Sequence, residues 1–430
     1  MPVRLDSAAP DFARAFDDLL ASKRESSDEV GTIVAAIIAD VRARGDAALL
    51  EYTAKFDRLE LTAETLRFSA DDIAEAAARV PADIREALQF AHDRIRAHHE
   101  KQKPADHVYE DAEGVTLGTL WTPVETVGLY VPGGLAAYPS SVLMNAIPAS
   151  VAGATRIAMT VPTPDGVVND AVLAAAQIAG ITEIYRAGGA QAIAALAFGT
   201  ESIPAVSKIV GPGNAFVAAA KRQVFGTVGI DMIAGPSEVL VIADRSANPA
   251  WVAADLLAQA EHGGGAQSIL VTTDPDLADA VTAEVDRQLA LLPREQIARE
   301  GWDEFGAVIT VASLDQAVEL ANRIASEHVE LAIDEPQSLL PKIRNAGAIF
   351  LGHHTPEAIG DYVGGSNHVL PTARSARFAS GLGVLDFMKR TSLLGCTPAS
   401  LATLAPAARI LADTEGLDAH GRSVAIRLNS

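Results

Sequence analysis

The chain has 430 residues, of which 49% are hydrophobic and 21% charged, so it is long enough for two or three globular domains. Its formal net charge of −21 argues against a nucleic-acid-binding protein, because a phosphate backbone selects for Lys and Arg. With one cysteine, Cys396, no disulfide can form within the chain. No signal peptide or membrane span is evident, and we expect a cytoplasmic protein that binds neither nucleic acid nor membrane.

Residues 1–105 are predicted to be helical. Apolar residues recur at helical spacing over 29–58, with basic side chains on the opposite face. Ser69 and Asp72 have the spacing of a capping box, which predicts the start of another helix. We expect the helical region to end near Pro104, because proline cannot continue a helix.

From about residue 126, short β-branched segments alternate with Ala-rich helical segments, which indicates parallel sheets covered by helices. In the first series the expected strands are 126–131, 157–161, 183–186 and 208–210, and the expected helices are 141–151, 170–178, 190–198 and 214–225. In the second series the strands are 238–243, 268–272, 307–311, 329–333 and 348–351, and the helices are 249–260, 276–291, 314–324 and 337–343. The predicted organisation is a helical region over 1–105, α/β domains over 106–237 and 238–380, and an extension over 381–430 with a short helical tail.

Three glycine-containing turns follow predicted strands, at 130–134, 188–191 and 211–214. The Gly-x-Gly-x-x-Gly fingerprint is absent, so a dinucleotide would have to bind without the standard pyrophosphate turn. Each turn lies between a strand and a helix, where open α/β sheets bind ligands. One such turn is most often structural, but three in succession, with side chains to form hydrogen bonds, favour a cofactor cleft. The side chains are those of Tyr130, Gln191 and Asn214.

A set of nitrogen and oxygen ligands suggests a metal site. Gln259 and His262 are three residues apart at the end of a predicted helix, so their side chains share a face. Asp361 follows a predicted strand, and His420 lies in the C-terminal tail. Such a set suits zinc. The residues are distant in sequence, so spacing alone leaves open both a zinc site and ordinary polar positions.

Glu327 and His328 are adjacent at the entrance to the predicted strand 329–333. Their side chains point to opposite sides if the strand conformation already holds there. Such a pair can supply one base for a substrate and another for water. The alternative is an ordinary polar strand edge.

Six sequence blocks, spread over nearly the whole chain, are long enough to be specific. The blocks are VGLYVPGG at 127–134, KIVGPGNAFVAAAKRQVFGTVGIDMIAGPSE at 208–238, SEHVE at 326–330, NHVLP at 367–371, GLGVLDFMKRT at 381–391 and the tail 415–420. In this order they resemble the blocks of the histidinol dehydrogenase family. The resemblance implies two consecutive Rossmann-like parallel-sheet domains of the aldehyde-dehydrogenase-like kind. It also implies oxidation of L-histidinol through L-histidinal to L-histidine with two NAD, in the last steps of histidine biosynthesis.

The same resemblance implies a role for each candidate residue. One zinc ion per subunit would be held by Gln259, His262, Asp361 and His420. Glu327 and His328 would be catalytic, and His328 would also contact the substrate together with the zinc ligands, Ser237, His368 and Glu415. NAD would contact Tyr130, Gln191 and Asn214. The enzyme would be a homodimer in which the partner's C-terminal segment completes each site, so that Glu415 and His420 act in trans.

Three alternatives remain open at this point. The nearest is a paralogous zinc- and NAD-dependent dehydrogenase that acts on another small alcohol, such as a sulfonated diol. A zinc hydrolase would need no NAD and would leave the glycine turns unexplained. A metal-binding protein without catalysis would tolerate replacement of Glu327 and His328.

Overall fold

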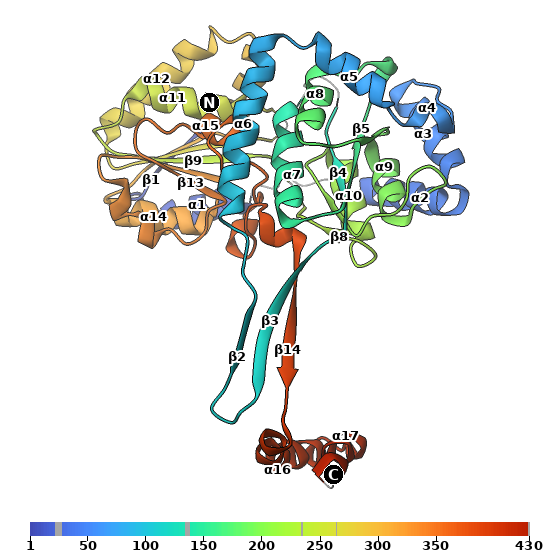
Figure 1. Cartoon of the computed structure of the whole chain (residues 1–430). Coiled ribbons are helices and arrows are strands. Elements are labelled where there is room, and N and C mark those ends of the chain that lie inside the picture. Colours follow the sequence, from blue (N-terminus) through green and yellow to red (C-terminus); the bar gives the residue numbers. More distant parts are fainter. Residues whose placement is uncertain (22–27, 134–137, 234, 264, 429–430) are drawn as a thin grey trace.

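The computed structural model describes residues 1–21, 28–133, 138–233, 235–263 and 265–428. Two lobes lie side by side, each built around a parallel sheet, and an arm that ends in helices extends away from them (Figure 1). The predicted α/β class with two parallel sheets is confirmed. None of the described helices combines the length and apolar character needed to cross a bilayer.

The first lobe contains a five-stranded parallel sheet in the order β6-β5-β4-β7-β8. Its strands are β4 (Thr126–Tyr130), β5 (Arg156–Val161), β6 (Glu183–Arg186), β7 (Lys208–Val210) and β8 (Gly229–Ile230). The helices that follow them are α7 (Pro139–Ala152), α8 (Asp170–Ile178), α9 (Gly189–Phe198) and α10 (Ala215–Val224). From the central β4 the chain runs outward through β5 and β6, and then on the other side through β7 and β8. The strand order therefore reverses between β4 and β7, as it does in dinucleotide-binding sheets.

N-terminal helices cover the first lobe. They are α2 (Asp28–Arg44), α3 (Asp46–Asp57), α4 (Ala63–Leu66), α5 (Ala70–Arg79) and α6 (Ala82–Glu100). Helix α2 packs on α9 and α10, α5 on α8, and α6 on α7, so both faces of the sheet are buried. The predicted capping box is confirmed, since the Ser69 hydroxyl accepts a hydrogen bond from the Asp72 N–H and the Asp72 carboxylate accepts one from the Ser69 N–H.

The second lobe contains a six-stranded parallel sheet in the order β1-β11-β10-β9-β12-β13. Its strands are β1 (Val3–Asp6), β9 (Glu238–Ala243), β10 (Gln267–Thr272), β11 (Ala307–Thr310), β12 (His328–Ala332) and β13 (Ala348–Leu351). Its helices are α1 (Phe12–Ala21), α11 (Pro249–Ala260), α12 (Pro275–Leu289), α13 (Glu295–Phe305), α14 (Leu314–Ile324) and α15 (Glu357–Tyr362). Separate apolar clusters fill the two faces of this sheet.

Two predictions of helix are wrong. Within the region 1–105, residues Val3–Asp6 form strand β1, because they pair in parallel with β11 at the sheet edge, Val3 opposite Ala307. Residues 337–343 form two short 3-10 turns instead of one helix. Pro341 lies inside that stretch. Proline has no backbone N–H to donate, and its ring clashes with the preceding turn of a helix.

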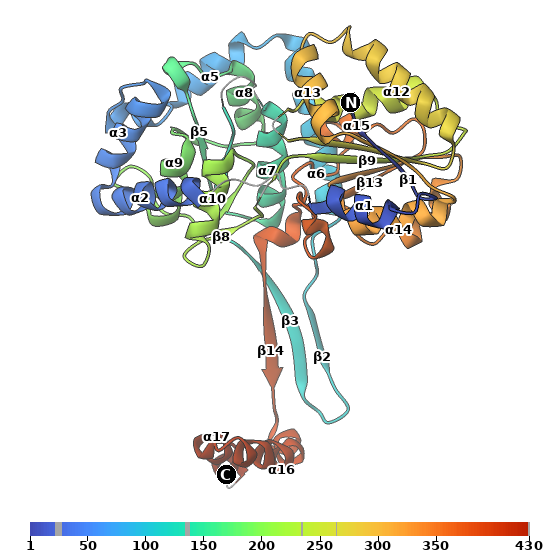
Figure 2. The same cartoon turned by 180° about the vertical axis from the view of Figure 1, so that it is seen from behind.

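The arm is a three-stranded antiparallel sheet in the order β14-β3-β2. Its strands are β2 (His107–Glu110), β3 (Thr116–Pro123) and β14 (Met388–Gly395), and β14 pairs with all eight residues of β3. The predicted helical tail is confirmed as α16 (Pro398–Thr414) and α17 (Asp418–Ala425), which lie at the far end of the arm in both views (Figures 1 and 2).

Candidate active site

The predicted catalytic pair lies at the edge of the second sheet where β9 and β12 begin. His328 is the first residue of β12 and is 4% exposed, and Glu327 directly precedes it. In the parallel ladder His328 lies opposite Val239, next to Glu238, the first residue of β9. Both members of the pair are thus held against the start of the neighbouring strand.

A backbone carbonyl determines which nitrogen of His328 is free. Its Nδ1 lies 3.0 Å from the carbonyl oxygen of Glu238, which can only accept, so Nδ1 carries the hydrogen. The other nitrogen, Nε2, is buried and has no hydrogen-bond partner among the described residues. Burial lowers the pKa of His328 to about 4, so the ring is neutral at neutral pH. His328 therefore presents an unprotonated nitrogen to the site.

The carboxylate of Glu327 also lies at the start of β9. Its Oε2 accepts a hydrogen bond of 3.0 Å from the N–H of Glu238, and the hydroxyl of Ser237 also donates to this carboxylate. The side chains of Glu327 and His328 do not point to opposite sides of a strand. The strand begins only at His328, and Glu327 Oε2 is 3.9 Å from His328 Nδ1. Burial raises the pKa of Glu327 well above its usual value. Once ionised, this carboxylate is a stronger base than an ordinary glutamate.

Of the four predicted zinc ligands, Asp361 lies near this pair, and Gln259 and His262 lie together at the end of α11. Gln259 is fully buried on α11, and its Oε1 has no hydrogen-bond partner in the described structure. His262 follows α11, and its Nδ1 lies 3.1 Å from the carbonyl oxygen of Ala258, which leaves Nε2 without its hydrogen. Asp361, on α15, has Oδ1 3.9 Å from His328 Nε2. A buried amide oxygen without a partner, a free imidazole nitrogen and a carboxylate fit a zinc ion.

The fourth predicted ligand lies elsewhere in the same chain. His420 is on α17 and Glu415 follows α16, so both are at the end of the arm, away from the lobes (Figures 1 and 2). Within the described residues, no group of three His, Cys, Asp or Glu side chains is arranged to hold a metal ion. The four predicted ligands are therefore not brought together within one chain.

His368 is held between two elements. Its Nδ1 is 3.0 Å from the carbonyl oxygen of Asp361, so Nδ1 donates, and its Nε2 accepts from the hydroxyl of Ser141, 3.1 Å away. Burial lowers the pKa of His368. Ser141, in the first turn of α7, was not predicted, and its sequence context gives no signal of a contact that spans 227 residues.

A second residue that the sequence analysis missed is Glu357. It is buried, and its Oε2 lies 3.4 Å from Nδ1 of His328. Burial raises its pKa well above the usual value, with the nearby carboxylate of Asp361 as the next cause. The available signal was its spacing from Asp361, since residues four apart on α15 share a helix face.

The predicted cofactor turns lie at the carboxyl ends of strands in the first sheet. Tyr130 ends β4, and its hydroxyl accepts a hydrogen bond of 3.1 Å from the N–H of Gly189. Gln191 is buried on α9, and the side chain of Asn214 caps α10. The turn predicted at 130–134 is described only to Gly133, since Gly134 lies outside the described residues.

Only glycine fits at the Gly211 turn. A Cβ atom at Gly211, where φ is +116°, would collide with the carbonyl oxygen of Tyr130. Beneath the turn, the fully buried Lys221 donates to the carbonyl oxygen of Gly211 at 2.9 Å and pairs with Asp231. Asp231 accepts from the N–H of Gly211 at 2.8 Å. The turns lie after parallel strands and before helices, where open α/β sheets bind dinucleotides, so their position fits NAD.

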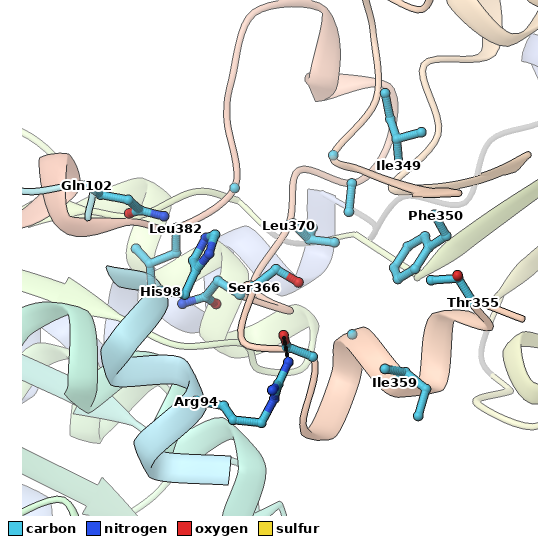
Figure 3. Close-up of a pocket in the computed structure, with 16 residues that line it drawn as sticks. Arg94, His98, Gln102, Ile349, Phe350, Thr355, Ile359, Ser366, Leu370 and Leu382 are labelled. Atoms are coloured by element: carbon cyan, nitrogen blue, oxygen red, sulfur yellow. Dashed lines mark hydrogen bonds between the residues drawn. The ribbon is translucent and has the colours of Figure 1, made fainter. Parts of the chain in front are cut away.

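A cavity of about 520 Å³ lies beside this site, between α6, β13 and α15. Figure 3 shows Arg94 and His98 of α6 on one side of it and Phe350 and Ile359 on the other. The cavity is lined by none of the predicted site residues, although the ring of Phe350 lies 5.9 Å from that of His328. It is a neighbour of the candidate site and separate from it.

Comparisons with known proteins agree on one family. Residues 20–428 match the family model described as histidinol dehydrogenase. Histidinol dehydrogenases from Mesorhizobium japonicum and Agrobacterium fabrum are each 63% identical over 429 residues, covering all of this chain and 100% and 99% of the relatives. The crystal structure of histidinol dehydrogenase from Elizabethkingia anophelis has a TM-score of 0.95 and 39% identity, covering 100% of this chain and 98% of that one. The chain therefore belongs to the histidinol dehydrogenase family.

Proposed function

We propose that this protein is a zinc- and NAD-dependent histidinol dehydrogenase. It oxidises L-histidinol through L-histidinal to L-histidine, in the last steps of histidine biosynthesis, and uses two NAD. Relatives that cover the whole chain carry this name, which favours histidinol over a sulfonated diol or another small alcohol. The observation that carries the proposal is the buried, unprotonated Nε2 of His328, 3.9 Å from the Asp361 carboxylate.

His328 and Glu327 have different roles in the two oxidations. Each oxidation removes one hydride from carbon and one proton from oxygen, and Nε2 of His328 accepts the proton each time. Between the oxidations a water adds to the aldehyde: the carboxylate of Glu327 takes the proton that this water loses, and the aldehyde oxygen takes the proton that His328 holds, which gives the hydrated aldehyde and leaves Nε2 free for the second oxidation. The Ser237 hydroxyl holds Glu327 through its hydrogen bond. Ser237 and His368 also bind the polar groups of the substrate.

Two bound groups supply chemistry that side chains lack. Zinc would be held by Gln259, His262, Asp361 and the partner subunit's His420, and there it would orient the substrate's nitrogen atoms and polarise the reacting group. NAD would lie at the turns that carry Tyr130, Gln191 and Asn214, and it would accept the hydride. The residues of this chain provide the orientation and the proton transfers.

We also propose that the active unit is a homodimer in which each tail completes the partner's site. The C-terminal tail exposes large apolar side chains that the chain itself does not cover, including Ile410 and Leu411 of α16 and Ile426 just after α17, each at least 60% exposed. Next to Asp361, Ile359 and Tyr362 are also exposed. A second copy that places its tail there would bury both sets and bring Glu415 and His420 to the ligands that one chain leaves incomplete.

Activity and metal dependence test the function directly. Purified protein should form NADH from L-histidinol, lose this activity with a chelator and recover it with added zinc. Two molecules of NADH should form per histidinol consumed. Unchanged turnover after complete removal of metal contradicts the zinc part, and turnover of a diol in preference to histidinol contradicts the substrate.

Mixed dimers test the shared site. His262→Ala removes a ligand from the lobes, and His420→Ala removes one from the tail, so each variant alone should be inactive. In a mixed dimer, one site combines an intact lobe with the partner's intact tail. Random mixing should therefore restore about a quarter of the wild-type activity, because half of the dimers are mixed and each has one intact site. If each tail serves its own chain, mixing restores nothing.

A further inference from the structure

A buried carboxylate, that of Asp57, lies at the carboxyl edge of the first sheet, and few groups of the chain donate hydrogen bonds to it. Asp57 is the last residue of α3 and is 7% exposed. Among the described residues its one hydrogen bond comes from the N–H of Thr163, at 3.3 Å. Burial raises the pKa of Asp57, because few groups of the chain replace the hydrogen bonds that water would make to its carboxylate. Such a carboxylate has strong capacity to accept hydrogen bonds from a ligand.

Asp57 lies where the glycine turns meet. Pro162, which follows β5, is in close contact with the positions where Cβ atoms would stand at Gly133, after β4, and at Gly188, after β6. The next residue along, Thr163, is the one that donates to Asp57. Burial raises the pKa of the Tyr130 hydroxyl, and the charge of Asp57 adds to this increase. Asp57 is therefore part of the predicted cofactor edge, although it comes from the N-terminal region.

The strand order identifies which part of a dinucleotide would meet Asp57. The order β6-β5-β4-β7 equals the order 3-2-1-4 of dinucleotide-binding sheets, with β4 as the first strand and β5 as the second. In those sheets a carboxylate beyond the second strand accepts hydrogen bonds from the adenosine ribose. Here Thr163, two residues after β5, donates its N–H to Asp57 of α3, which brings this carboxylate to the corresponding strand end. The hydroxyl of Thr163 is buried and has no partner within the described residues.

The neighbouring acidic and basic groups are already occupied. Arg58 forms a two-pronged ion pair with Asp165, with Nε to Oδ1 at 2.7 Å and a second contact at 2.5 Å. Asp165 and Arg58 are thus paired with each other in the structure, and both side chains are exposed. A phosphate placed near Asp57 would meet an unpaired carboxylate.

We propose that Asp57 binds the 2′-hydroxyl of the adenosine ribose of NAD and makes the protein select NAD over NADP. The inference rests on the proposed function, because it assumes that NAD binds at this edge. The ribose hydroxyl donates to the carboxylate, whereas the 2′-phosphate of NADP carries negative charge and has no proton to donate in its place. NADP binding then leaves two like charges facing each other in a buried setting.

Equilibrium binding to the zinc-loaded protein tests this without reference to turnover. Isothermal titration calorimetry with NAD, NADP and NAD that lacks the adenosine 2′-hydroxyl gives three dissociation constants for each variant. The wild type should bind both NADP and the deoxy analogue at least tenfold more weakly than NAD, since a hydrogen bond to a charged group contributes about ten- to a hundredfold. Asp57→Asn should weaken NAD binding about tenfold and bring NAD and NADP within about threefold of each other.

Two matched variants serve as controls. Asp46→Asn alters another buried carboxylate at the opposite end of α3, where it accepts from the Ser202 hydroxyl, and it should leave the NAD to NADP ratio unchanged. Asp165→Asn tests the neighbouring acid of the loop after β5. It should leave NAD binding unchanged, although NADP binding can rise as Arg58 is released.

The outcomes separate the inference from the proposed function. If the wild type binds NAD but Asp57→Asn keeps both its affinity and its preference, the inference is overturned and the function stands. If Asp165→Asn instead of Asp57→Asn removes the preference, the assignment to Asp57 is likewise wrong. Should Asp57→Asn fail to fold, the wild type decides alone, because equal binding of NAD and its deoxy analogue overturns the inference. Absence of NAD binding overturns both.

Discussion

Replacing Lys221 with methionine should destabilise the first lobe and weaken NAD binding at the same time. Lys221 and the carboxylate of Asp231 are almost fully buried, and together they hold the N–H and the carbonyl oxygen of Gly211. Removing the ammonium group leaves a buried carboxylate without its counter-charge, which costs about 3–5 kcal/mol. In a lobe of this size each kcal/mol lowers the melting temperature by about 2–4 °C, so we expect a decrease of about 6–20 °C.

A double variant separates the charge from the hydrogen bonds. Adding Asp231→Leu to Lys221→Met replaces the ion pair with two apolar side chains, which is often neutral for stability. The melting temperature should recover by more than half, while NAD affinity should stay low because Gly211 has lost both partners. Calorimetric melting and NAD titration measure the two effects.

A surface pair provides the control for this experiment. Arg299→Met breaks an exposed ion pair with Glu295 on α13 and should leave both readings nearly unchanged. The reasoning is refuted if Lys221→Met melts within about 2 °C of the wild type. It is also refuted if the double variant is less stable than either single variant.

Three further changes test the site. Glu327→Gln should slow NADH formation from histidinal, whose oxidation needs a water, far more than the first hydride transfer from histidinol, and equal losses in single-turnover assays argue against separate bases. The lowered pKa of His328, about 4 against about 6.5 when unfolded, means that the unfolded chain binds more protons in this window. The contribution of His328 to stability is complete above pH 6.5 and is lost as the pH falls towards 4. In the His328→Gln variant the melting temperature should therefore depend less on pH between 4 and 6.5. An unchanged slope of melting temperature against pH contradicts the burial argument. Gln259→Ala should lower bound zinc and activity together, and full zinc content by metal analysis rules out this ligand.

The parts of the fold that follow local rules could be predicted from the sequence. Strand β9 was predicted with its observed bounds, because six consecutive buried residues, most of them β-branched or aliphatic, lie between turn residues. Strand β1 was not, since the alternating residues of Val3–Asp6 become a strand only by pairing with a segment 304 residues further along the chain. The arm strands were missed for a related reason: β2 is exposed at all four positions and carries no burial pattern.

The candidate site also has parts that the sequence predicts and parts that it does not. Glu327 and His328 attract attention as neighbours at a strand entrance, yet their shared attachment to Glu238 depends on the register of β12 against β9. The contact of Ser141 with His368 and the place of Asp57 beside Thr163 join segments of different elements. Side-chain convergence of this kind is a property of the tertiary fold, and no spacing in the sequence encodes it.

The pairing of β14 with β3 makes the reach of the tail a fixed structural dimension. Both strands run eight residues in register, so the tail is fastened to a segment about 270 positions earlier and cannot slide independently. Shortening the arm without disturbing its faces requires removing residues from both strands in even numbers, at about 3.4 Å per residue. A change in the length of one strand alone would turn its side chains to the opposite face of the arm and displace the terminal helices.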